Sequence, residues 1–82
     1  MECLLINNID RIHTTNMGLA RIRGNIGIDN LDVIEWCKNR ILDRKALIER
    51  QGKNWYVHID GYILTVNASS YTVITVHKER CA

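Results

Sequence analysis

Apolar and polar residues alternate with a period of two over the C-terminal third of the chain, from Trp55 to His77. Two short turn-like segments, Asp60-Gly61 and Ala68-Ser69-Ser70, divide this stretch into three strand-length runs rich in β-branched residues. Asp-Gly between alternating apolar runs indicates a tight hairpin, because a type I′ turn needs positive φ at both central residues. The pattern therefore predicts an antiparallel meander.

The lengths of the two turns predict which residues face each other. A two-residue turn at Asp60-Gly61 sets Val57 opposite Leu64 and gathers the apolar residues of both strands on one face. A three-residue turn at 68–70 sets Leu64 opposite Ile74 and Tyr62 opposite Val76. The other face then carries a mixed set: Tyr56, His58, Ile63, Thr65, Asn67, Tyr71, Val73, Thr75 and His77. This mixed face is the most function-like feature of the chain.

The N-terminal half shows the wider spacing of helices. Leu4, Leu5, Ile9 and Ile12 predict a first helix over residues 2–12. Thr14 or Thr15 is a suitable cap for a second helix over 16–24, which Gly24 and Gly27 end. Asp29 or Asn30 is a suitable cap for a third helix over 31–42, and residues 46–50 read as a short strand.

Helices followed by strands predict a single α+β domain over residues 1–82. We expect two to three N-terminal helices packed on one face of a three- to four-stranded antiparallel β-meander. The opposite face is then open to water or to a partner.

Composition is that of an ordinary soluble domain with a modest core, since 46% of the 82 residues are apolar and 24% are charged. The chain lacks an apolar run of transmembrane length and a signal-peptide pattern, so we expect a cytoplasmic protein without membrane contact. Cys3, Cys37 and Cys81 are odd in number and far apart. This spacing favours free thiols over a disulfide framework or a zinc site.

Charge is unevenly distributed although the net value is only +2. Residues 38–53 hold six cations and two acids: Lys38, Arg40, Arg44, Lys45, Arg50 and Lys53 against Asp43 and Glu49. Such a local excess attracts phosphate groups. The alternative is helix-end chemistry, because cations are favourable at helix C-termini.

The sequence contains no glycine-rich phosphate loop, metal-ligand spacing or serine-hydrolase elbow, so we expect no metal and no cofactor. RNA cleavage without a metal needs a general base, a general acid and cations beside the phosphate. His77, His58 and His13 are the proton-transfer candidates, and Thr75 is a positioning group. Candidates for phosphate or base contacts are Arg21, Arg23, Arg50, Lys78, Tyr56 and Tyr71. The alternative is that these are ordinary residues of an exposed sheet face.

Three runs of the chain carry a family resemblance: IHTTNMGLARIRGNIGI, DVIEWCKNRI and GKNWYVHIDGYILTVNASSYTVITVHK. Together they resemble an uncharacterised family of small bacterial proteins, the domain of unknown function 3781. More distantly, the chain is similar to the barnase, EndoU, colicin and RelE-like nuclease superfamily. The matching positions are His13, Arg21 and the strand end Ile74-Thr75-Val76-His77, whereas Asn25 stands where the toxin-like pattern has a second arginine.

The resemblance implies a small cytosolic RNA-binding or metal-independent, toxin-like ribonuclease domain. The residues leave a second hypothesis open, a non-catalytic protein-interaction module such as a small phage-type inhibitor of a host or defence protein. Such a module would bind through the open sheet face or an edge strand. Either surface would also suit a homodimer.

Overall fold

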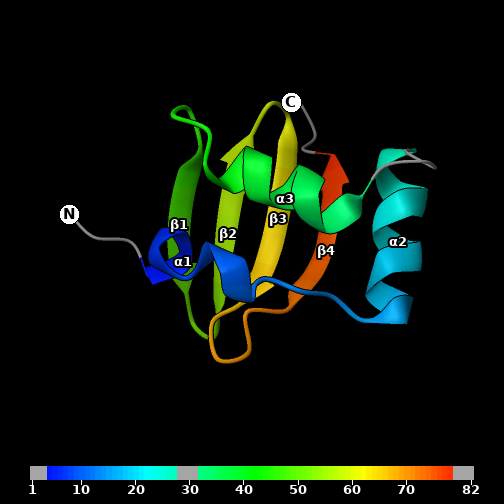
Figure 1. The fold of residues 1–82 in the computed structure, drawn as a ribbon. Helices are drawn as coiled ribbons and strands as arrows, with labels where there is room; N and C mark the ends of the chain where they lie inside the picture. Colours follow the sequence, from blue (N-terminus) through cyan, green and yellow to red (C-terminus); the bar gives the residue numbers. More distant parts are fainter. Residues whose placement is uncertain (1–3, 28–31, 79–82) are drawn as a thin grey trace.

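The computed structural model describes residues 4–27 and 32–78, and within them the fold is α+β, as predicted. The strands form one antiparallel meander in the order β1-β2-β3-β4. Helices α1 and α3 lie across one face of this sheet, whereas α2 stands beside β4 at the edge (Figure 1). The elements in chain order are α1 (Leu4–Asn7), the 3₁₀-helix η1 (Ile9–Arg11), α2 (Asn16–Ile26), α3 (Val33–Ile41), β1 (Leu47–Gln51), β2 (Asn54–Ile59), β3 (Tyr62–Asn67) and β4 (Val73–Lys78).

The predicted first helix is broken into α1 and η1 at Asn8. The backbone of Asn8 leaves the helical region (φ −117°, ψ 30°), and its side-chain Nδ2 donates to the carbonyl of Leu4 at 2.9 Å. Asparagine side chains compete for backbone partners in this way, which is why they favour helix ends.

Helix α2 is capped as the sequence suggested but runs further. The hydroxyl of Thr15 accepts from the N–H of Gly18 at 3.0 Å, and the helix ends at Gly27 in the left-handed region (φ 70°). Gly24 is an interior residue, so the predicted end there is wrong. Helix α3 uses Asp32 as its cap, and the predicted caps Asp29 and Asn30 lie outside the described residues.

The β2–β3 hairpin confirms its predicted register. Asp60 (φ 51°) and Gly61 (φ 80°) both take positive φ, as a type I′ turn requires. Val57 faces Leu64, and both side chains are buried against the helices.

The β3–β4 pairing differs from the prediction by two residues, because Leu64 faces Val76 rather than Ile74. Tyr71 adopts positive φ (59°) and lengthens the turn by one residue. A bulge between Thr65 and Val66 then makes Ile74 an extra residue in its strand. Val73 consequently faces the helices and is fully buried. Its predicted position on the opposite, mixed face is therefore wrong.

The core fills the space between the helices and one face of the sheet. Its fully buried members come from both halves of the chain: Leu5, Ile22, Val33, Cys37, Ile41, Val57, Leu64, Val66, Val73 and Val76. The ring of Trp36 in α3 meets that of Tyr62 in β3 edge to face, with centroids 5.2 Å apart. This contact fixes α3 above the sheet.

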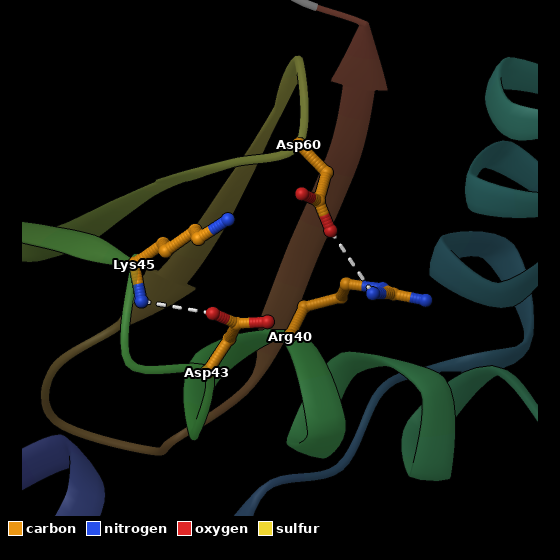
Figure 2. Close-up of polar contacts among 4 residues, drawn as sticks. All are labelled: Arg40, Asp43, Lys45 and Asp60. Carbon is orange, nitrogen blue, oxygen red and sulfur yellow. Dashed lines mark hydrogen bonds and ion pairs between the residues drawn. The ribbon is translucent and has the colours of Figure 1, made fainter.

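Polar contacts hold the C-terminal end of α3 over the sheet (Figure 2). Arg40 stacks on Trp36 at 5.1 Å, and its Nη1 lies 3.0 Å from Oδ2 of Asp60 in the β2–β3 turn. Just after the helix, Asp43 Oδ1 accepts from the N–H of Lys45 at 2.8 Å. These contacts join the helix end to two turns.

Candidate functional site

The segment before α2 pairs with the chain at the start of β4 through one strand-like bridge. His13 forms a parallel bridge with Thr72, in which its N–H donates to the carbonyl of Tyr71 and its carbonyl accepts from Val73 at 2.7 Å. The hydroxyl of Thr14 donates to the carbonyl of Val73 at 2.8 Å. Backbone groups on the β4 edge are thereby satisfied, which is a common way of protecting an edge strand.

Asn25 makes a second attachment to β4, nearer the C-terminal end of the strand. Its Nδ2 donates to the carbonyl of Val76 at 3.1 Å and to the hydroxyl of Thr75 at 3.3 Å. Gly18 allows the close approach, because a Cβ there would collide with the hydroxyl of Thr14 and lie 3.5 Å from the carbonyl of Val73. We call the contact between α2 and β4, held by Thr14, Gly18 and Asn25, the α2–β4 seam.

The face of the sheet turned away from α1 and α3 carries two cross-strand rows of side chains, and we call it the open face. One row runs through Leu47, His58, Ile63 and His77. The next row runs through Glu49, Tyr56, Thr65 and Thr75, and Asn25 extends it onto α2. Residues paired directly across antiparallel strands share a face and interact. The register therefore places His58, His77, Tyr56 and Thr75 on the same face of the sheet.

Glu49 is a member of this site that sequence reasoning missed. Its Oε2 lies 3.7 Å from Nε2 of His58 on the neighbouring strand. The side chain of His58 is 29% exposed and that of Glu49 is 57% exposed. A carboxylate beside an imidazole restricts the orientation of the ring. The alternation of residues in β1 could have placed Glu49 on this face, but only if the register of β1 against β2 had been known.

His58 and His77 lie on β2 and β4 with Ile63 of β3 between them. Two strand spacings separate their backbones by roughly 10 Å. His77 is exposed at the end of β4.

The two arginines of α2 point in different directions. Arg21 is exposed and stands four residues before Asn25, so it shares the side of the helix that meets Thr75. Arg23 is also exposed but is rotated to another side of the helix. Of these two arginines, Arg21 is the one at the rim of the open face.

Besides Arg23, three predicted binding residues are not on the open face. Tyr71 is buried, with its ring 5.4 Å from that of Trp55, so it is not available for stacking on a base. Arg50 faces Trp55, and Lys78 faces Tyr62, on the side of the sheet that carries the helices. The one-residue alternation of strands sends them to the opposite side from their neighbours Glu49 and His77.

His13 lies at the far end of the α2–β4 seam. Its Nε2 lies 3.1 Å from the hydroxyl of Thr72, and that hydroxyl lies 2.7 Å from the hydroxyl of Ser70. His77 is five positions after Thr72 along the chain, a span of roughly 16 Å in extended backbone. The three histidines therefore do not converge on one phosphate position.

Residues 4–27 and 32–78 include no group of three His, Cys, Asp or Glu side chains arranged to hold a metal ion. Over the same ranges, no helix has both the length and the apolar character needed to cross a bilayer. Burial raises the pKa of the Cys37 thiol to about 12, which keeps it protonated and poorly nucleophilic.

Comparison with known proteins identifies the family to which the chain belongs. Neither the curated proteins nor the solved structures include a match to this chain. One family model, described as a protein of unknown function (DUF3781), matches residues 6–77. This match begins at the end of α1 and covers the α2–β4 seam and nearly the whole sheet, and the chain is therefore a member of the DUF3781 family.

Proposed function

We propose that this protein binds RNA on the open face and cleaves it without a metal ion. The observation that carries the proposal is the placing of two histidines, His58 beside Glu49 and the exposed His77, in one row of a sheet face without a covering helix. Arg21 at the rim supplies the nearest positive charge that the helix can offer. The distant resemblance of His13, Arg21 and the strand end Ile74-Thr75-Val76-His77 to the nuclease superfamily supports the same function.

The chemistry assigned to these groups is transfer of the phosphodiester to the neighbouring 2′-oxygen. In this step the 2′-oxygen bonds to phosphorus, its proton passes to a base, and the 5′-oxygen leaves with a proton from an acid. His58, oriented by Glu49, is the proposed base, and His77 is the proposed acid. Arg21 stabilises the charge that develops on the phosphate oxygens. Thr75, held by Asn25, and Tyr56 position the substrate between them.

The test is incubation of the purified protein with total RNA, with and without EDTA. We expect cleavage that resists EDTA, disappears in His77→Ala and falls by about 10²-fold or more in Arg21→Gln. Arg23→Gln is the matched control, since it removes the same charge from another side of the same helix and should leave the rate unchanged. Intact RNA with wild-type protein of verified fold would refute the proposal.

A protein-interaction module is the second candidate, and one observation favours it. In the described part of the chain, the paired residues of the open face include no Lys or Arg, but they include Ile63 and a Leu47 that is 68% exposed. Few charges with aromatic and aliphatic side chains are typical of the centre of protein interfaces. Binding of a protein partner here would be lost in Ile63→Asp and retained in His77→Ala. RNA cleavage, in contrast, should be more sensitive to His77→Ala than to Ile63→Asp.

A further inference from the structure

Two arginines lie against a pair of neighbouring aromatic rings on the helix side of the sheet, one arginine on each ring. The rings of Trp55 and Tyr71 are almost fully buried and lie 5.4 Å apart with an angle of 41° between their planes. Cζ of Arg11, from η1, lies 4.6 Å from the centre of the Tyr71 ring. Cζ of Arg50, from β1, lies 5.5 Å from the centre of the Trp55 ring. Segments 39 residues apart in the sequence thus bring two guanidinium groups to one aromatic platform.

The platform holds these guanidinium groups without neutralising them. Stacking on an aromatic face is electrostatically favourable for a cation and restricts its motion. Arg50 is further held by a bond from its Nε to the carbonyl of Gly52 at 3.1 Å. Among residues 4–27 and 32–78, ion pairs involve Arg40 with Asp60 and His58 with Glu49, and neither Arg11 nor Arg50 takes part in one. Their charge is therefore available to a ligand.

Lys53 adds a third cation at the same end of the sheet. Its carbonyl accepts from the N–H of Ala68 at 2.8 Å, which holds the β1–β2 turn beside the turn that carries Tyr71. The side chains of Arg11, Arg50 and Lys53 are all exposed. None of them takes part in the open-face rows, because Arg50 faces Trp55 and the other two lie outside the strands.

We infer that Arg11 and Arg50, with Lys53 beside them, form a binding site for a phosphate group. A guanidinium presents several N–H donors in one plane and pairs with two phosphate oxygens at once. Because stacking already fixes these planes, less rotational freedom is lost when the anion binds. The phosphate belongs either to a free polyphosphate or to an RNA backbone, and the inference does not require the cleavage proposed for the open face.

The experiment is calorimetric titration of the full chain at low salt with pyrophosphate and, separately, with a short single-stranded RNA. We expect saturable binding that weakens about tenfold or more in Arg11→Gln and Arg50→Gln and is unchanged in Arg23→Gln. The variants Arg11→Lys and Arg50→Lys keep the charge and lose the planar donors, so they should weaken binding as well. Circular dichroism confirms that each variant is folded.

The two titrations distinguish the sources of the phosphate. Binding of pyrophosphate that depends on both arginines assigns the site to a free polyphosphate. Binding of RNA alone, with the same dependence, assigns it to a nucleic acid backbone. Absence of saturable binding of either probe to the wild-type chain overturns the inference, as does equal affinity in a folded Arg11→Gln, Arg50→Gln double variant. The RNA cleavage proposed for the open face should be retained by that double variant, which separates this inference from the proposed activity.

Discussion

Gly18→Ala should destabilise the protein, although alanine is the better helix former. In an unobstructed helix interior the change stabilises by about 1 kcal/mol. At Gly18 the added Cβ meets the hydroxyl of Thr14, lies 3.3 Å from that of Thr15 and 3.5 Å from the carbonyl of Val73. The Thr14 side chain can move away only by giving up its hydrogen bond to Val73, and the Thr15 cap is disturbed at the same time.

These losses outweigh the gain in helix propensity. A buried carbonyl left without its donor costs about 1–3 kcal/mol, and a weakened N-cap costs about 1 kcal/mol. We therefore expect Gly18→Ala to lower the free energy of unfolding by about 1–3 kcal/mol.

Urea denaturation followed by circular dichroism measures the change, provided that the slope with urea is the same for the variant and the wild type. Gly24→Ala is the matched control, because a Cβ at Gly24 meets no atom within 4 Å in the same helix. It should raise the free energy of unfolding by about 1 kcal/mol. If Gly18→Ala proves as stable as Gly24→Ala, the close approach of α2 to β4 described above is refuted.

Three further predictions concern the core, the α2–β4 seam and the α3 contact. In a variant that carries Cys3→Ser and Cys81→Ser, the remaining thiol of Cys37 should resist thiol reagents at neutral pH. Its raised pKa also implies a pH dependence of stability. The contribution of this thiol to the free energy of unfolding is fully present below about pH 9 and falls by about 1.4 kcal/mol per pH unit from there towards pH 12, because only the unfolded thiol ionises in that window. A flat pH profile of urea midpoints would contradict this. Asn25→Ala should cost about 1–2 kcal/mol in urea denaturation, whereas exposed Asn39→Ala on α3 should be near neutral, and equal effects would refute the seam. Asp60→Gly should change the free energy of unfolding by less than about 1 kcal/mol, because its ion pair with Arg40 is partly exposed to solvent and glycine suits the positive φ; a larger loss in urea denaturation would contradict this prediction.

The β2–β3 hairpin was predictable because its information is local. Asp60-Gly61 defines the turn, and the alternation on either side permits one register that buries Val57 with Leu64. The β3–β4 register was not predictable in the same way. Tyr71 takes positive φ in a turn where its ring packs on Trp55, and no neighbouring residue in the sequence indicates that conformation.

The candidate site was predictable only in part for a similar reason. His58, His77 and Thr75 share a face because alternation within strands is regular. Glu49 joins them through the pairing of β1 with β2, and Asn25 joins them through the docking of α2, and both depend on tertiary contacts. Arg50 and Lys78 were misplaced because a cation's position in the sequence does not reveal which side of a sheet it occupies.

The attachment of α2 along β4 has a consequence for self-association. A sheet with two open edges can add neighbours on both sides and so extend into a fibre. Here Thr14 and Asn25 donate to the carbonyls of Val73 and Val76 and α2 lies along the outer edge of β4, so in the described part of the chain β1 is the strand whose outer edge is left for pairing. Strand-to-strand growth through this sheet therefore terminates at two chains, and polymerisation would first require α2 to detach.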